Sequence, residues 1–305
     1  MLLLLEQLLN GLQYGVMLFL LAAGLTLVFG IMGVINLAHG SLFMVGAYAA
    51  AATAGRTGSF ALAAVAALVA SGVAGLAIEF LVIRRLYDRD HLDQVLATFG
   101  LLLFFNELMA TLAGRTPLFM QPPAWLGGAV EIIPGVPYPT FRLAILATGL
   151  AVAGGLAFLI ARTRLGMLIR AGATHRAIVG ALGVDIRLLF TLVFALGALL
   201  AGLAGLMAAP ILAVQVGMGE QILIATFVVV VIGGLGSVRG AFVGALLVGL
   251  VDTLARAFLP GLLKQVFAAT TADALGAGLA SAAIYLLMAL VLLVRPARPA
   301  ARLRG

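Results

Sequence analysis

The chain has 305 residues, of which 64% are hydrophobic and 10% charged, with a formal net charge of +7 and no cysteine. Soluble domains average about 45–50% apolar and about 25% charged residues, so this composition excludes a soluble protein. Without cysteine, a disulfide framework, a thiol nucleophile and a cysteine-bound metal are also excluded.

Runs of apolar residues recur along the whole chain, and about 20 of them are needed to cross a bilayer. The pattern predicts an all-α, polytopic integral membrane protein with about eight or nine transmembrane helices, some of them broken or re-entrant. The candidate spans are 12–30, 38–54, 60–83, 94–113, 142–161, 188–209, 221–235, 240–259 and 275–294. The second and the seventh are short and could each be half of a broken helix.

The basic residues, nearly all arginine, lie in short segments beside the spans, which is typical of membrane orientation rather than of nucleic-acid binding. Arginines follow the third candidate span, fill the 162–187 connection and recur in the tail, so these segments and the C-terminus are predicted to be cytoplasmic. The proline-rich 114–141 connection is predicted to face outward. Nine crossings place the N-terminus outside, and eight place it inside.

Two glycine-rich interruptions break the apolar pattern, one at Gly30–Ser41 and one at Gly233–Gly240. Irregular backbone at membrane depth is tolerated only where protein or a water-filled cavity satisfies it, and paired interruptions point to a transport site. The predicted substrate-pathway residues are Gly33, Asn36, His39, Gly40, Ser41, Gly233, Gly236 and Ser237. The alternative is that both interruptions are glycine-rich turns between helices.

Polar groups inside spans each need an explanation, because they are costly in lipid. Asn106 and Glu107 lie deep in the fourth candidate and are added to the predicted pathway. Glu79 lies close to Arg84 and Arg85 and is predicted to form an interfacial ion pair. Asp252 and Arg256 are one helical turn apart and are predicted to pair along one face.

Several motifs of enzymes are missing from the sequence. Lys264 is the single lysine, so a phosphate-binding loop ending in Gly-Lys-Ser/Thr cannot exist. No nucleophile elbow or His-Glu-x-x-His motif occurs, and His39 has no companion ligands for a metal. We therefore expect no catalytic residue, no metal and no cofactor of the chain's own.

The 162–187 connection has an apolar face from Met167 to Leu182, which predicts a short helix that Gly183 ends. At the inner face of a membrane, such a helix could lie on lipid or fit a groove on a cytoplasmic partner.

The chain resembles the inner-membrane permease subunits of branched-chain amino acid ABC importers, the LivH family, over nearly its whole length. The resemblance rests on Gly-Ile-Met-Gly-Val-Ile-Asn-Leu-Ala-His-Gly-Ser at 30–41 and on Val-Ile-Gly-Gly-Leu-Gly-Ser-Val-Arg-Gly-Ala at 231–241. Arg-Leu-Gly-Met at 164–167, followed by Ala-Leu-Gly-Val at 181–184, adds to it. It implies one permease domain over 1–305, with a cytoplasmic coupling loop at 162–187.

The same resemblance implies that the helix over 165–184 docks onto an ATPase subunit that binds the ATP. The residues assigned to this coupling are Arg170, Ala173, Thr174, His175, Ala177 and Gly183. Family members often carry an acidic residue where this chain has Thr174 and His175. This difference from the family bears on the detailed contacts between the helix and the ATPase subunit.

The predicted function is therefore a permease subunit that moves branched-chain or related small neutral amino acids across the bacterial inner membrane. The implied partners are a second permease subunit, cytoplasmic ATP-binding subunits, a periplasmic substrate-binding protein and the lipid bilayer, with no nucleic acid. Urea, short amides and other small polar solutes remain open as substrates. The alternative is an ion-coupled secondary transporter or a channel for a small polar solute.

Overall fold

The computed structural model describes residues 2–294, except for the side chains of Ile133 and of residues 175–177, and the basic tail beyond 294 lies outside this range. Within it the fold is helical. The helices are α1 (Leu2–Met32), α2 (His39–Thr57), α3 (Phe60–Leu81), α4 (His91–Ala113), α5 (Thr140–Arg162), α6 (Arg164–Ala181), α7 (Ile186–Ala208), α8 (Met218–Gly233), α9 (Val238–Leu263) and α10 (Ala269–Val294). Short 3₁₀ turns, η1 (Ile83–Arg85) and η2 (Ala124–Leu126), lie in the connections.

Every candidate span of the sequence corresponds to a helix. Seven helices are long and apolar enough to cross a membrane by length and composition, so the protein is a multi-pass membrane protein. Helices α2 and α8 fall outside these seven, and α8 has only 16 residues. Sixteen residues extend for roughly 24 Å, less than the roughly 30 Å of a bilayer's hydrocarbon core. The prediction that the seventh segment is short is confirmed, whereas α2, at the second segment, has 19 residues.

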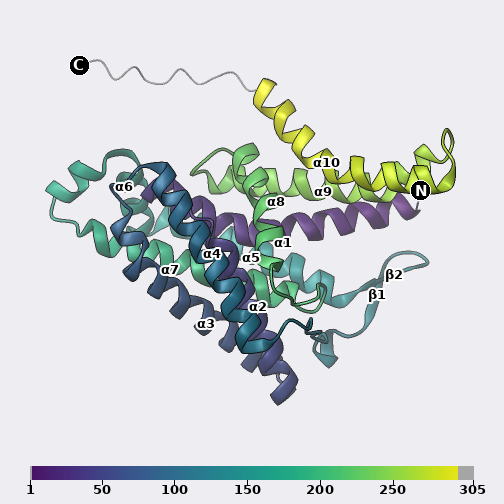
Figure 1. Ribbon diagram of the computed structural model, residues 1–305, viewed down its shortest axis with the longest axis horizontal. Coiled ribbons are helices and arrows are strands. Elements are labelled where there is room, and N and C mark those ends of the chain that lie inside the picture. The colour runs from purple at the N-terminus through teal and green to yellow at the C-terminus, as the bar shows by residue number, and fades with distance from the viewer. Residues whose placement is uncertain (1, 295–305) are drawn as a thin grey trace.

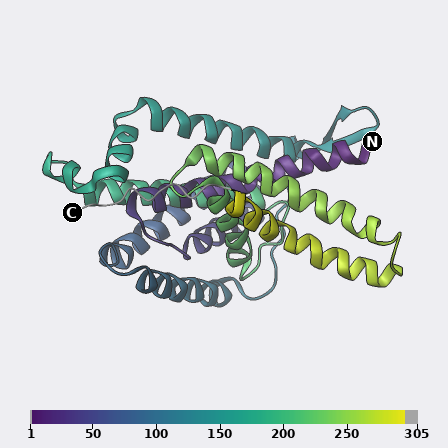
Figure 2. The same cartoon turned by 90° about the horizontal axis from the view of Figure 1, so that it is seen from above.

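Helix α1 is the centre of the bundle. Of its most hydrophobic stretch 89% is buried, against 17% for α4 and α5 and 11% for α10. It runs through the middle of the molecule, with α9 beside it along much of its length and α5 on another flank (Figures 1 and 2). The outer helices expose long apolar side chains, as lipid-facing helices do, and Phe104 and Leu286 are among them.

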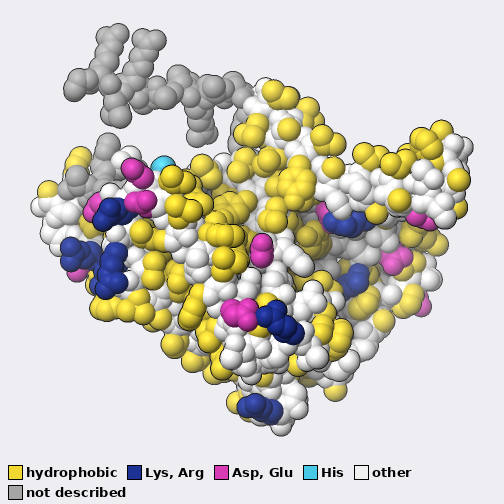
Figure 3. Space-filling view, in the orientation of Figure 1, with side chains coloured by type: hydrophobic (Ala, Val, Ile, Leu, Met, Phe, Trp, Pro, Cys, Tyr) yellow, Lys and Arg dark blue, Asp and Glu magenta, His cyan; other side chains and the backbone are white. Residues whose placement is uncertain are grey.

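The two ends of the bundle differ. One end carries the N-terminus, the α9–α10 turn and a small hairpin of β1 (Ala129–Ile133) and β2 (Val136–Pro139), while the other carries α6 (Figure 1). The hairpin is antiparallel, with Ala129 opposite Pro139 and an irregularity between Glu131 and Ile133. Basic side chains gather at the α6 end, and apolar ones cover much of the flank (Figure 3).

Two ion pairs predicted from the sequence are confirmed. Glu79 is fully buried and lies 3.1 Å from Arg84, whose guanidinium also donates to Thr191 of α7. The Tyr87 hydroxyl donates to the same carboxylate, and burial, followed by this neighbour, raises the pKa of Tyr87 above its ordinary value. The pair therefore ties α3 to α7 at the α6 end of the molecule.

The second pair joins Asp252 to Arg256 at 2.8 Å along α9. Asp252 is buried and Arg256 is largely exposed. One turn of helix is enough to bring the two charges together, so this contact needs no tertiary structure.

Candidate functional site

The first interruption, residues 33–38, joins α1 to α2. Gly33 ends α1 with a φ of 68°, a left-handed conformation that glycine adopts at no steric cost. Helix α4 holds the irregular segment, because the backbone N–H of Ile35 donates to Gln94 and the Thr98 hydroxyl donates to the Ile35 carbonyl. The break is thus a fixed feature of the interior and not a surface loop.

Polar side chains of this interruption are sealed in the core. Asn36, His39 and Ser41 are at most 2% exposed, and none of their side-chain nitrogen and oxygen atoms makes a hydrogen bond of ordinary geometry in the described chain. The His39 imidazole lies against the backbone of α1 near Leu21 and Gly24. Buried polar atoms without partners are costly, so this cluster has unmet hydrogen-bonding capacity at the middle of the bundle.

The N-terminal ends of the two short helices meet beside this cluster. A methyl group placed on Gly40 of α2 would lie 2.4 Å from the carbonyl oxygen of Gly219 in α8. One placed on Gly219 would lie 2.1 Å from the carbonyl oxygen of Gly40. The two backbones are in direct contact, which no residue larger than glycine permits. Gly40 therefore serves close packing, and its own φ is that of a helix.

The second interruption, residues 234–237, joins α8 to α9. Gly234 and Gly236 have φ values of 89° and 80°, whereas Gly233 is the last helical residue of α8. Ser237 caps α9 by accepting a hydrogen bond from the N–H of Gly240 at 3.0 Å. The left-handed conformation that Gly33 adopts in the first break therefore falls on Gly234 and Gly236 in the second.

Helix α1 connects the two interruptions. A methyl group on Gly30, three residues before Gly33, would lie 2.6 Å from the Cα atom of Gly236. Gly233 and Gly240 are equally close to each other, so the second break folds tightly on itself. A displacement of the 234–237 segment must therefore also displace the end of α1, which leads directly into the first break.

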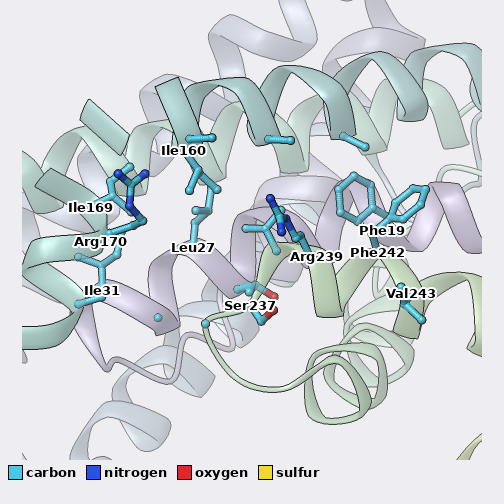
Figure 4. A pocket seen from close by; sticks show the side chains of 18 residues that line it. Phe19, Leu27, Ile31, Ile160, Ile169, Arg170, Ser237, Arg239, Phe242 and Val243 are labelled. Atoms are coloured by element: carbon cyan, nitrogen blue, oxygen red, sulfur yellow. The ribbon is translucent and has the colours of Figure 1, made fainter. Parts of the chain in front are cut away.

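A cavity of about 750 Å³ opens between α1, α5, α6 and α9, at the end of the bundle that carries α6 (Figure 4). Its wall is apolar, with Phe19 and Phe242 at one end and Ile169 at the other, next to Arg170. The polar side chains that line it are Thr26, Arg170, Ser237 and Arg239, and no carboxylate is among the lining residues.

Helix α6 lies at one end of this cavity. It starts at Arg164, after the hydroxyl of Thr163 caps the N–H of Gly166, and it ends before Gly183, whose φ is 87°. The prediction of a helix ended by Gly183 is confirmed. Gly172 packs against Leu189 and Ile31, while the apolar side chains of Met167, Ile178 and Leu182 are exposed.

The residues that the sequence assigned to coupling and to the pathway lie in different surroundings. Arg170 and Ala173 line the cavity, and Thr174 is exposed and donates to the Arg170 carbonyl. His175 and Ala177 lie on α6, in the stretch whose side chains are not described. Gly236 and Ser237 line the cavity, whereas the polar residues of the first break lie apart from its lining.

Asn106 and Glu107 lie on α4, away from the cavity lining. Glu107 is exposed and pairs with Arg115 at 2.9 Å, and Asn106 is half-buried. Sequence reasoning did not single out Thr26 or the lining role of Arg239. The sequence offered one signal for Arg239, which is a charged residue in the second break with no acidic residue beside it.

Residues 7–295 match the protein family described as the permease component of branched-chain amino acid transport systems. The chain is 30% identical over 262 residues to the high-affinity branched-chain amino acid transport system permease protein BraD of Pseudomonas aeruginosa, covering 81% of this chain and 85% of that protein. It is 28% identical over 275 residues to the permease protein LivH of Escherichia coli, covering 86% and 89%. No solved structure matches the chain.

Proposed function

This chain belongs to the family of permease components of branched-chain amino acid transport systems, and from that premise we propose that it is one pore-forming half of an ATP-driven importer in the bacterial inner membrane. Its transported solute is a branched-chain or related small neutral amino acid, the class that the names of its relatives carry. Permease components transport a solute and do not catalyse a reaction.

The observation that supports an external motor is the placement of α6. This helix has defined ends, packs on α1 and α7 through Gly172, and presents exposed apolar side chains at Met167 and Ile178. A helix that exposes apolar side chains at the basic end of a membrane bundle can fit a hydrophobic groove of a cytoplasmic partner. We assign that groove to an ATP-binding subunit, with Arg170, Ala173, Thr174, His175, Ala177 and Gly183 in the coupling segment.

The inner part of the solute route runs through the cavity beneath α6. Its volume lies in the range of about 300–1,000 Å³ that is typical of small-molecule sites, and its apolar wall suits an aliphatic side chain. A second permease subunit completes the route on the open side. A displacement of α6 changes the shape of the cavity directly, because Ile169, Arg170 and Ala173 of this helix form one wall of the cavity.

The two interruptions are the proposed moving parts. A transporter must bind its motor differently in its two access states, so some backbone has to change conformation. Gly33, Gly234 and Gly236 hold the conformations that only glycine adopts easily, and the contact between Gly30 and Gly236 links both breaks. Asn36, His39 and Ser41, whose polar atoms lack partners, gain solvent or solute when the first break opens.

The N-terminus, the β1–β2 hairpin and the α9–α10 turn lie at the end of the bundle opposite α6 (Figure 1). With α6 inside, the N-terminus and the hairpin of β1 and β2 face the periplasm, where a substrate-binding protein delivers the solute. The C-terminus is then cytoplasmic, in agreement with the positive charge of the tail.

The test is reconstitution of the chain into liposomes with and without candidate ATP-binding, permease and binding-protein partners. ATP-dependent uptake of labelled leucine that requires the partners supports the proposal. Concentrative uptake by this chain alone, abolished by an uncoupler while ATP is maintained, identifies an ion-coupled transporter and refutes it. Uptake only down a gradient identifies a channel and also refutes it.

A further inference from the structure

Arg239 is an exposed cation without a counter-charge in the described chain, and it lines the apolar cavity. It stands one residue into α9, between the Phe19–Phe242 end and the Ile169–Arg170 end of the cavity (Figure 4). Among the described residues it makes no ion pair and no side-chain hydrogen bond. A guanidinium beside apolar walls binds a carboxylate most strongly, because this planar anion accepts two parallel hydrogen bonds from it.

A second polar group in the same cavity also lacks a partner. Thr26 of α1 is fully buried, and its hydroxyl makes no hydrogen bond in the described chain. The hydroxyls of Thr98 and Thr226, also buried in helices, donate to the carbonyl four residues earlier at 2.7 and 2.8 Å. Thr26 does not make this local bond, although it lines the cavity. Its hydroxyl oxygen is enclosed in this conformation, so it meets a group that enters the cavity only after its own side chain or a neighbouring one moves.

The absence of acidic side chains from the described lining also affects which ligands the cavity favours. Its described lining contains two arginines and no aspartate or glutamate. A ligand's ammonium group finds no counter-charge here and is repelled by both guanidinium groups, whereas a carboxylate is attracted by them. The end walls of Phe19 and Phe242, whose rings contact each other edge to face, accommodate an aliphatic group.

We propose that Arg239 binds the carboxylate of the transported amino acid, with the Thr26 hydroxyl as an additional hydrogen-bonding group and the Phe19–Phe242 end holding the side chain. The inference rests on the proposed function and adds the chemical group that this half of the pore recognises. It assigns the cavity to carboxylates with an aliphatic tail. The ammonium group of the solute is recognised elsewhere in the complex.

The absence of cysteine from the chain allows a direct occupancy measurement. Ala157 of α5 lines the cavity, and Ala151 of the same helix is exposed and lies outside the lining. Ala157→Cys and, as a matched control, Ala151→Cys are introduced singly into the assembled transporter in nanodiscs of zwitterionic lipid. The rate of maleimide labelling of this chain is measured with leucine, with leucinamide, which lacks the carboxylate, and with 4-methylpentanoate, which lacks the ammonium group.

Leucine and 4-methylpentanoate are expected to slow labelling at Ala157→Cys, leucinamide is not, and labelling at Ala151→Cys is expected to stay unchanged. Arg239→Gln should raise the leucine concentration needed for protection by roughly 10- to 100-fold, the loss expected for charge-assisted hydrogen bonds. Thr26→Val should raise it by roughly threefold to tenfold. Arg56→Gln, which removes an exposed arginine at the far end of α2, should have no effect.

Equal protection by leucinamide and leucine, or unchanged protection in Arg239→Gln, overturns the inference. Slower labelling on adding phosphatidylglycerol to the nanodiscs, without an effect of leucine, also overturns it, because the cavity is then a site for an anionic lipid. In each of these cases, ATP-dependent leucine uptake by the unmodified complex leaves the proposed function standing. Failure of that uptake rejects the proposed function itself.

Discussion

The contact between Gly40 and Gly219 gives a prediction whose size follows from the structure. In Gly40→Ala the new methyl group would lie 2.4 Å from the Gly219 carbonyl oxygen and 3.1 Å from the Cβ atom of Leu223. An ordinary contact begins at 3.4 Å, so α2 and α8 must separate by about 1 Å. Overpacking of this kind in a dense interior costs about 1–3 kcal/mol. We expect a lower thermal midpoint and reduced uptake.

The matched control is Gly154→Ala on α5, where the added methyl group meets nothing within 4 Å. It should leave uptake unchanged and, by removing a glycine from a helix, raise stability by up to about 1 kcal/mol. Thermal unfolding of the purified protein in detergent and ATP-dependent uptake in cells measure both variants. The double variant Gly40→Ala/Gly219→Ala should lose less stability than the sum of the single changes, because one separation relieves both clashes. Equal midpoints for Gly40→Ala and Gly154→Ala would refute the close contact.

Three further changes test other parts of the argument. Gly236→Val forces a β-branched residue into a φ of 80° and should abolish uptake while membrane insertion, measured by fractionation, is retained; normal uptake would remove this break from the mechanism. Arg84→Met leaves the fully buried Glu79 carboxylate without its cation and should lower the thermal midpoint more than Glu79→Gln does, as compared by thermal unfolding. Thr163→Ala removes the N-cap of α6 and should weaken that helix by about 1 kcal/mol, which lowers solute-stimulated ATP hydrolysis by the assembled complex; unchanged stimulation argues against α6 as the coupling element.

Local features were predictable from the sequence because they depend on neighbours along the chain. The positions of the membrane helices follow from runs of apolar residues, although α1 begins at Leu2, well before its predicted start, and the end of α6 follows from Gly183. The pair of Asp252 and Arg256 is separated by one helical turn, and Glu79 and Arg84 by five residues, so both contacts were anticipated. The family was likewise recognisable from the residues of the two interruptions.

Which face of each helix meets lipid, the core or the cavity was decided only by the tertiary structure. In a soluble protein an apolar stripe marks the buried face, but lipid and core are both apolar, so the membrane helices of this chain carry little such signal. Glu107, which was predicted to line the pathway, lies on an exposed face of α4, paired with Arg115, which the sequence did not indicate. Asn36 and His39 are sealed between helices, whereas Arg239 and Thr26 line the cavity.

Composition and pattern determined that this chain is a bundle of membrane helices with two interruptions and a further helix in the 162–187 connection, because the bilayer imposes the length and polarity of each segment. The contacts of Gly40 with Gly219 and of Gly30 with Gly236 join residues far apart in sequence, and only the packed bundle brings them together. The same packing leaves the space between α1, α5, α6 and α9, which Arg170 and Arg239 line.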